Sequence, residues 1–417
     1  MLNKTYKEFD NLILFMQSRN TIMIDSNNIN REFSDEKEFS LQVINKDKVE
    51  NVIYSLNVLL AHTSNQYNVS QKIIQEINKN MEIKNNKIEN KILQKIQKWI
   101  NLANETFNCE TKVAIETVIN KKILIDTTYS TSYFEENYYI ISFNIDKSSV
   151  NLISDFQVTE LINDDTVENV LDEIINEIKW SNYQKWKIPE FSDNYEVVFN
   201  SYSSGLFFHE FIGHFLETDH FIRSSLSKCE KRVLSKNLNV YENYNISQTF
   251  DDNGDPIIKN IHLIYNGEII NLLSSRWDNQ NFKNSGNGRR GNLKLPVITR
   301  MRDMYIQPGL NSEGYYLKDI KKGIYIHKIG MGEVNIFSGD FSVEVSQGSL
   351  IESGQITKPL QPFYLYLDIN KFLDKEIIVC SNSGEYNSLC GKKGSTVKVK
   401  YKSPSIIIKG LGDAIHE

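Results

Sequence analysis

The amino-acid sequence predicts an α+β protein with two domains. These are an N-terminal α/β domain over residues 1–190 and a mainly antiparallel C-terminal β domain over residues 191–417 that carries a buried helix. Three observations support this prediction. Helical and strand-like hydrophobic periodicities both occur in the first half, and in the second half glycines separate short β-rich runs. Between the halves, the segment 187–194 contains the proline and Asx residues typical of a linker.

In the first half, apolar residues at helical spacing predict helices, and β-branched or aromatic runs predict strands. We expect helices over residues 47–60 and 166–180. Residues 70–102 are expected to form one long helix, or two helices interrupted near Asn85 and Asn86. Strands are expected over residues 21–25, 39–44, 113–118, 123–126, 138–143 and 150–158, with turns at Asn120-Lys121 and Asp146-Lys147.

Composition and charge exclude several classes of protein. The formal net charge is −6, whereas a nucleic-acid-binding protein or one that binds an anionic membrane surface usually has a basic excess. No stretch approaches the roughly 18 consecutive apolar residues of a membrane-spanning helix. The apolar run 12–16 is too short for the core of a signal peptide, so we expect a cytoplasmic protein. The four cysteines are widely spaced, which argues against a disulfide framework.

The second half opens with an expected strand over residues 195–199 and a very apolar helix over residues 203–220, with Ser203 or Ser204 as its N-cap. Four ionisable residues interrupt this helix: His209, Glu210, His214 and Glu217. Burying them is costly unless each is paired or bound to something. One interpretation is a pair of core histidines with carboxylate partners. We favour the other, which is a metal site.

The spacing of the two histidines is unusual. Zinc peptidases of the H-E-x-x-H type place both histidines on one helical face, whereas this sequence has H-E-x-x-x-H. In a regular α-helix His209 and His214 would lie about 140° apart, which is too far for one ion. We therefore expect an irregular helix, with a π-type bulge near Gly213 that brings the two side chains onto one face.

A third candidate ligand lies in the C-terminal region. Cys390 is followed by Gly391, Lys392, Lys393 and Gly394, and a cysteine in a turn beside lysines has a lowered thiolate pKa. On its own, a solvated turn is the simpler interpretation. Beside two imidazoles, a thiolate would complete the kind of ligand set that suits zinc.

Three segments resemble the TldD/PmbA family of metallopeptidases. Residues 195–219, YEVVFNSYSSGLFFHEFIGHFLETD, are similar to the family's strand and H-E-x-x-G-H-x-L-E-x-D helix. SGNGRR at 285–290 resembles its glycine-arginine loop, and CGKKG at 390–394 its C-G-K-x-G motif. Residues 331–359 follow its pattern of short strands. The resemblance covers the second half only.

The resemblance implies a zinc ion held by His209, His214 and Cys390, with Glu210 as the catalytic glutamate that accepts the proton of the attacking water. It also implies a chain of the TldD type, which keeps the metal motif, in a homodimer or in a heterodimer with a PmbA/TldE-like subunit. The implied substrates are small or unfolded peptides, and some family members remove leaders during peptide maturation. The alternative is a non-hydrolytic binding or scaffold subunit with a structural metal, which would have no need of Glu210.

Other residues carry weaker predictions. Arg289 and Arg290 either clamp a peptide carboxylate or carbonyl or form a basic surface turn. Glu217 either supports a ligand histidine or is a capping or solvated carboxylate. Lys392 either touches substrate or is a mobile solvated lysine, and we favour the second. We expect His220 to be exposed, His262 and His327 to be structural, and Cys380 to lie in the core.

Overall fold

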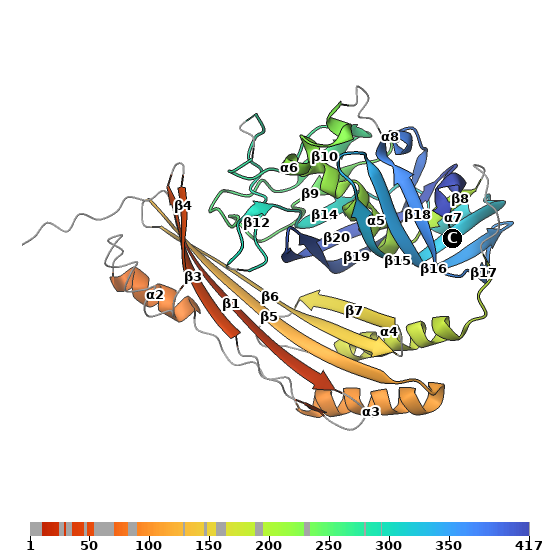
Figure 1. Ribbon diagram of the computed structural model, residues 1–417, viewed down its shortest axis with the longest axis horizontal. Helices are drawn as coiled ribbons and strands as arrows, with labels where there is room; N and C mark the ends of the chain where they lie inside the picture. Colours follow the sequence, from red (N-terminus) through yellow and green to blue (C-terminus); the bar gives the residue numbers. More distant parts are fainter. Residues whose placement is uncertain are drawn as a thin grey trace, which may run out of the picture.

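The computed structural model describes residues 11–24, 29–30, 36–45, 48–53, 71–81, 90–127, 130–145, 148–155, 164–187, 195–228, 234–278, 281–292 and 294–416. Strands β1–β7 form one sheet and strands β8–β11 and β14–β21 a second, and β12 pairs with β13 alone. Figure 1 shows the second sheet on one side of the first. The expected division at residue 190 stays a prediction, because residues 188–194 lie outside the described part.

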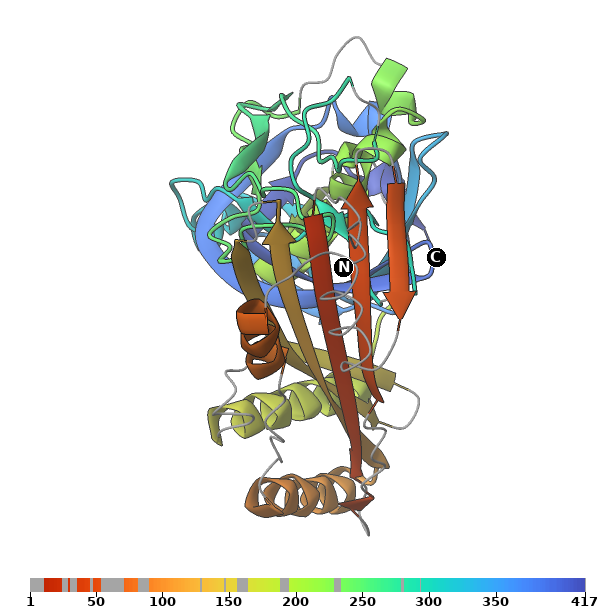
Figure 2. The same ribbon diagram turned by 90° about the vertical axis from the view of Figure 1, so that its left-hand side faces the viewer.

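The first sheet is antiparallel throughout, in the order β4-β3-β1-β5-β6-β7, with β2 paired to β1. Figure 2 shows these long strands side by side. The elements are β1 Asn11–Ile24, β2 Ile29–Asn30, β3 Glu36–Asn45, β4 Lys48–Ile53, α2 Gln71–Met81, α3 Asn90–Phe107, β5 Thr111–Asp126, β6 Thr131–Ile145, β7 Ser148–Asp155 and α4 Asp164–Asn182.

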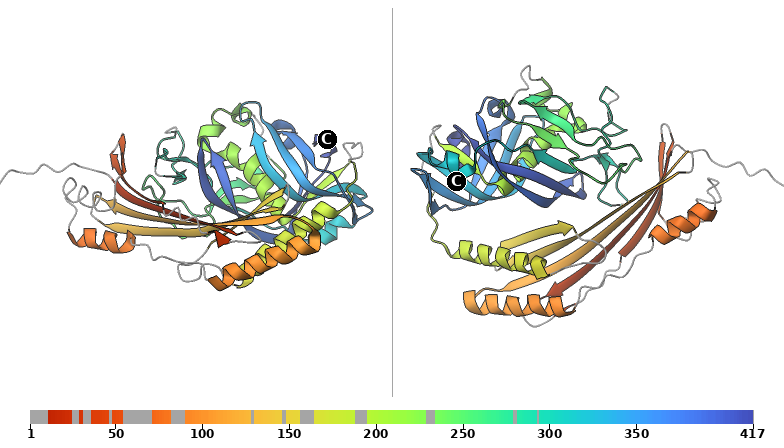
Figure 3. Two further views of the ribbon diagram at one scale, coloured as in Figure 1. Left: turned by 60° about the horizontal axis from the view of Figure 1, so that its bottom comes forward. Right: turned by 180° about the vertical axis from the view of Figure 1, so that it is seen from behind.

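Alternating side chains give this sheet two different faces. One face packs against apolar residues of the three helices, including Ile77 of α2, Ile96 of α3 and Ile174 of α4. Figure 3 shows α2 and α3 on the side of the sheet away from the second sheet. Helix α4 also contacts the second sheet, because Gln347 of β16 donates a hydrogen bond of 3.0 Å to Glu177 of α4. On the opposite face, Tyr138 and Ile140 pack against Leu389 of the second sheet. The N-terminal sheet therefore contacts the strand that carries Cys390.

Two predictions in this half are wrong. Residues 48–53 form β4 rather than a helix, because they pair with β3 in the register Leu41↔Val52 and Ile44↔Val49. Residues 54–60 of that expected helix lie outside the described residues. No turn occurs at Asn120-Lys121, because β5 runs through it in register with both β1 and β6. Pairing with neighbouring strands has overridden the local signals.

The remaining predictions for this half agree with the structure where it describes them. The segment 70–102 holds two helices, α2 and α3, and residues 82–89 between them are not described. Helix α4 contains the whole of the expected helix 166–180. The expected turn at 146–147 falls on residues that are not described. No described helix is both long and apolar enough to span a bilayer.

The second sheet has the order β11-β10-β9-β14-β20-β8-β15-β16-β18-β21, with β17 on β16 and β19 on β20. It is mainly antiparallel, as expected, with parallel pairs at β14–β20 and β8–β15. Its first elements are β8 Glu196–Phe199, α5 Ser201–Phe211, the 3₁₀ turn η1 Gly213–Leu216, α6 Thr218–Phe221, η2 Ser225–Lys228, β9 Val240–Glu242, β10 Ile261–Tyr265, β11 Glu268–Ile269, β12 Gly288–Arg289, β13 Ile298–Thr299 and β14 Asp303–Ile306.

The later elements are α7 Glu313–Leu317, β15 Lys322–Val334, β16 Asp340–Glu352, β17 Gln355–Pro359, β18 Phe363–Asp368, α8 Ile369–Phe372, β19 Ile377–Lys392, β20 Ser395–Ile408, η3 Gly412–Ala414 and β21 Ile415–His416. Helix α5 lies against β15, β19 and β20 (Figure 1). Two of its phenylalanines, Phe207 and Phe211, pack against Phe341 and Phe372 in the largest apolar core. This packing fixes the helix that carries His209 and that leads into the turn η1, which carries His214.

Candidate metal centre

The helix with the two histidines is interrupted between them. Asn200, rather than Ser203 or Ser204, caps α5 by accepting a hydrogen bond from the Ser203 backbone N–H. The α-helix ends at Phe211, and Gly213–Leu216 form a tighter 3₁₀ turn in which Phe215 N–H donates to the Ile212 carbonyl. The irregularity is therefore present, but it is a tightening and not the wider π-type bulge that we expected.

Gly213 packs closely against Met301 at this break. A Cβ atom at Gly213 would lie 2.3 Å from the sulfur of Met301, so any other residue here would require the methionine side chain to shift. The ring centroids of His209 and His214 lie 5.2 Å apart across the break. The two imidazoles are neighbours despite the five-residue spacing.

Cys390 reaches this pair from strand β19. One ligand atom from each of His209, His214 and Cys390 lies within 4.8 Å of the others, and all three residues are buried. Cys390 Sγ is 3.4 Å from His214 Nε2. Among the residues that the structure describes, neither ring nitrogen of His209 has a hydrogen-bond partner, although both are buried. Because buried polar atoms are normally satisfied, this histidine has the environment expected of a metal ligand.

The electrostatics of the three residues also suit a cation. Burial alone would raise the pKa of the Cys390 thiol, but His209 and His214 hold it well below its usual value. Burial would lower the pKa of His214, but the charges of Glu217 and Cys390 raise it well above its usual value. The thiol and the imidazoles thus each favour the charged form of the other, and a metal ion would replace the imidazole protons.

Glu210 lies next to these groups and is the most accessible member of the cluster, with 15% of its side chain exposed. Its Oε2 is 3.5 Å from His214 Nε2. A side chain at Gly332 would crowd it, because a Cβ there would lie 3.2 Å from Glu210 Cβ. Although burial opposes it, the neighbouring histidines lower the pKa of Glu210, so the carboxylate is ionised. An ionised, partly accessible carboxylate can accept a proton from a bound molecule.

Glu217 lies behind His214. It is fully buried, and its Oε2 is 3.1 Å from His214 Nδ1 and 2.8 Å from Lys392 Nζ. Two predictions are corrected here. Lys392 is buried and hydrogen-bonded rather than solvated. His220 is largely covered rather than exposed, with its Nδ1 3.2 Å from the His214 carbonyl oxygen.

Arg289 and Arg290 are buried in the structure. Arg289 Nη1 donates to the carbonyl of Met301 at 2.6 Å. The guanidinium of Arg290 lies 4.1 Å from the ring centroid of Phe15 in the N-terminal sheet. A basic surface turn therefore does not describe this loop, and a role in substrate binding stays a prediction.

Sequence reasoning missed two groups around this site. Asp251 and Asp252 accept hydrogen bonds from the backbone N–H groups of Gly288 and Arg290 and so hold the glycine-arginine loop. Arg300 is fully buried and donates to the carbonyls of Cys390 and Ser395, on both strands of the β19–β20 hairpin. The sequence DDNGD at 251–255 was the available signal for the first group; Arg300 had none.

The residues expected to be structural have structural environments. Cys380 is fully buried, which raises the pKa of its thiol to about 12. His327 Nε2 lies 3.0 Å from Ser349 Oγ, and His262 packs against Tyr241. Cys229 lies outside the described residues.

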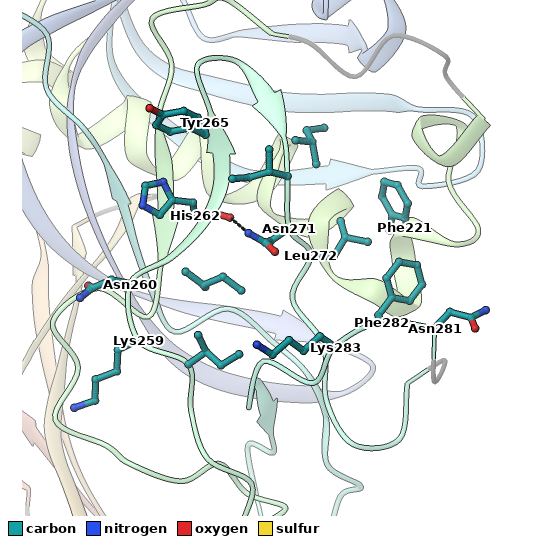
Figure 4. Close-up of a pocket in the computed structure, with 14 residues that line it drawn as sticks. Phe221, Lys259, Asn260, His262, Tyr265, Asn271, Leu272, Asn281, Phe282 and Lys283 are labelled. Atoms are coloured by element: carbon teal, nitrogen blue, oxygen red, sulfur yellow. Dashed lines mark hydrogen bonds between the residues drawn. The ribbon is translucent and has the colours of Figure 1, made fainter.

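A separate cavity of about 710 Å³ is lined in part by Phe221 of α6. Phe221, Leu272 and Phe282 contribute apolar surface to it, and Lys259 and Lys283 are its charged lining residues (Figure 4). None of His209, Glu210, His214 or Cys390 lines it. It is therefore distinct from the cluster of candidate metal ligands.

Comparison with known proteins finds a family match for the second half of the chain. Residues 192–413 match the PmbA/TldA metallopeptidase C-terminal domain. The chain is 30% identical over 233 residues to a metalloprotease TldD homologue of Buchnera aphidicola subsp. Acyrthosiphon pisum, covering 53% of this chain and 48% of that protein. It is 26% identical to a zinc metalloprotease TldD homologue of Saccharolobus solfataricus, covering 58% and 55%. The chain thus spans about half the length of these curated relatives.

The fold as a whole resembles solved structures more completely. The crystal structure of TldE from Thermococcus kodakarensis superposes with a TM-score of 0.67, covering 98% of this chain and 97% of that one. The sequence identity is 15%, so this likeness concerns the fold alone. It extends to the N-terminal half, where the sequence match does not reach.

Proposed function

The chain belongs to the PmbA/TldD family of metallopeptidases, and from this membership we propose that it is a zinc-dependent peptidase. The observation that carries the proposal is the convergence of two imidazoles and a thiolate within 4.8 Å, with a carboxylate beside them. Local sequence does not bring Cys390 near the histidines, so their meeting needs an explanation. A shared ion provides one.

The donor set fits zinc. Two imidazoles and a thiolate form a borderline-soft site, and three protein ligands are typical of a catalytic zinc that keeps one position open. Two further observations fit this assignment. The ring nitrogens of His209 have no hydrogen-bond partner among the described residues. Glu217 Oε2 lies 3.1 Å from His214 Nδ1, where it can accept the proton of that nitrogen. We propose His209, His214 and Cys390 as the ligands, with Glu217 supporting His214.

Each residue of this site then has its own role in hydrolysis. When bound, zinc would supply a Lewis acid that polarises a peptide carbonyl and makes water easier to deprotonate. Glu210 accepts the proton of the attacking water and passes it to the leaving amine. Glu217 holds the ring of His214 by accepting its Nδ1–H, so the ring does not rotate during turnover.

Substrate and assembly are proposed on the same family basis. We propose small or unfolded peptides as substrates, including leaders removed during peptide maturation, and a homodimer or a pair with a PmbA/TldE-like subunit. The cytoplasmic location stays a prediction. Light scattering at micromolar concentration, alone and with such a subunit, tests the assembly, and a monomer under both conditions would contradict it.

A second candidate is a non-hydrolytic subunit with a structural metal, which is favoured by the burial of both histidines. The variant Glu210→Gln separates the two. As a peptidase, the wild type cleaves unfolded peptides, whereas Glu210→Gln keeps its metal and loses activity by roughly 100-fold or more, the usual contribution of a general base. Metal content and peptide cleavage are measured for both proteins.

The exposed acid Glu385 provides a matched control, because Glu385→Gln removes a carboxylate that pairs with Lys400 in the second sheet and belongs to no candidate metal group among the described residues. This control should retain both metal and activity. If wild type and Glu210→Gln both hold metal and neither cleaves any peptide, even with a partner subunit, the structural-metal alternative is correct.

A further inference from the structure

Lys392 is a buried lysine at the centre of a polar cluster. Only 5% of its side chain is exposed. Its Nζ lies 2.8 Å from Glu217 Oε2, 2.7 Å from Asp219 Oδ1 and 3.2 Å from the Thr299 carbonyl oxygen. Three acceptors therefore match the three protons of the ammonium group, which fixes the side chain in one arrangement.

The position of Lys392 on strand β19 connects this cluster to Cys390. Residues two apart on a strand point to the same face, and Cys390 and Lys392 are both buried whereas Gly391 between them is exposed. A single strand thus presents a thiolate and an ammonium group to the segment α5–η1–α6. Arg300 anchors that strand through the Cys390 carbonyl.

Glu217 connects Lys392 to His214. The Oε2 atom of Glu217 that accepts from Lys392 is also the atom nearest His214 Nδ1. The other ring nitrogen, Nε2, faces Cys390 Sγ. With Glu217 in this position, the proton of a neutral His214 lies on Nδ1 and the lone pair lies on Nε2.

We propose that Lys392 is a positioning residue for the metal site: it holds Glu217 against Nδ1 of His214, and this leaves Nε2 to bind a divalent cation beside Cys390. The inference rests on the proposed metal centre. Strand β19 thereby supplies both a ligand and the group that orients another ligand. Such outer contacts typically change metal affinity by about 10–100-fold.

The simpler alternative is that Lys392 only neutralises two buried carboxylates. The neighbouring Lys393 allows a comparison, because 53% of its side chain is exposed and its Nζ contacts Asp219 but not Glu217. A role limited to charge balance would affect the stability of the fold without affecting the metal through Glu217.

The test measures zinc affinity by chelator competition, at one pH, for wild type, Lys392→Met, Lys393→Met, Glu217→Gln and the double variant Lys392→Met/Glu217→Gln. Thermal unfolding of each metal-free protein is also measured, so that zinc affinities are compared at a temperature at which every variant is folded. Cobalt spectra of the loaded proteins report whether the thiolate and the imidazoles still bind together.

We expect Lys392→Met to weaken zinc binding by about 10–100-fold and Lys393→Met to change it by less than about threefold. In the Glu217→Gln background, Lys392→Met should have little further effect, because the contact through which it acts is already altered. If Lys392→Met does not fold, Lys392→Gln, which keeps an amide donor, is judged by the same criterion.

Two results would overturn the inference. If wild type and Lys393→Met bind zinc tightly and folded Lys392→Met binds it equally well, the role of Lys392 is wrong and the proposed metal centre stands. If the wild type itself binds neither zinc nor cobalt, the proposed metal centre and this inference both fail.

Discussion

At the scale of single residues, Cys390 carries the sharpest expectation, because it lies 176 positions from His214 and yet 3.4 Å from its ring. Replacing Cys390 by Ser should weaken zinc binding by more than about 100-fold. The loss of a metal ligand should lower zinc affinity more than the loss of a residue that only contacts a ligand, which typically costs about 10–100-fold. X-ray absorption of the loaded wild type should show one sulfur at about 2.3 Å.

Cys109 and Cys380 are the matched controls, because both are free cysteines outside the cluster. Serine at either position should cost some stability and leave the zinc in place. A Cys390→Ser protein that binds zinc as tightly as the wild type would contradict the assignment of Cys390 as a ligand.

His327 carries an expectation about pH. Burial lowers its pKa to about 4, against an ordinary value near 6.5. The unfolded chain therefore takes up a proton at a higher pH than the folded protein does. The contribution of His327 to stability is full above about pH 6.5 and is lost as the pH falls toward about 4.

Chemical unfolding of the metal-free protein between pH 8 and pH 4 checks this expectation. His327→Gln should show a shallower loss of stability between about pH 6.5 and pH 4 than the wild type. At pH 8 the two proteins should differ by the lost contacts with Ser349, Trp180 and Tyr325. Parallel curves over the whole range would count against the lowered pKa.

At the scale of elements, the close approach of α5 to β20 positions the histidines. A Cβ at Gly205 would lie 2.2 Å from Cδ2 of Tyr401 and 2.6 Å from Oγ of Ser403. Gly205→Ala should therefore destabilise the fold by about 1–3 kcal/mol through overpacking. Zinc binding should weaken as well, because the helix must shift relative to the hairpin that carries Cys390.

Gly314 is a suitable control for Gly205. It also lies in a helix, α7, and no atom lies within 4 Å of the position its Cβ would take. Gly314→Ala should stabilise the protein slightly, by up to about 1 kcal/mol, because alanine favours helix. Denaturant unfolding of both variants measures the contrast, and equal effects of the two substitutions would contradict close packing at Gly205.

At the scale of the whole molecule, a buried ion pair joins the N-terminal sheet to the loop at residues 251–255. Lys122 of β5 lies 2.5 Å from Asp252 Oδ1, and Asp252 in turn accepts from the Arg290 backbone. Lys122→Met would leave a buried carboxylate without its cation, which typically costs about 3–5 kcal/mol. Lys112→Met removes an exposed pair with Glu110 and should cost less than about 1 kcal/mol.

Denaturant unfolding provides the measurement for this pair. The double variant Lys122→Met/Asp252→Asn removes both charges, and it should recover part of the loss. If Lys122→Met costs no more than Lys112→Met, the ion pair does not hold the N-terminal sheet to the loop at residues 251–255.

The sequence by itself determined the local content of this protein. Helical periodicity located α4 and the apolar helix α5 with His209, and β-branched runs between glycines indicated the strand-rich second half. The unusual spacing of His209 and His214 also showed that the helix between them is irregular. These features depend on neighbours within a few positions along the chain, which is the range that periodicity reports.

Tertiary structure alone decided the rest. Residues 48–53 form a strand because they pair with β3. Strand β5 continues through the turn expected at Asn120-Lys121 because it pairs with β1 on one side and β6 on the other. Packing of Met301 against Gly213 accompanied a 3₁₀ turn where a bulge was expected. Lys392 is buried because Glu217, Asp219 and Thr299 satisfy its ammonium group. Such outcomes depend on which distant groups satisfy a buried charge or backbone, and local sequence does not specify them.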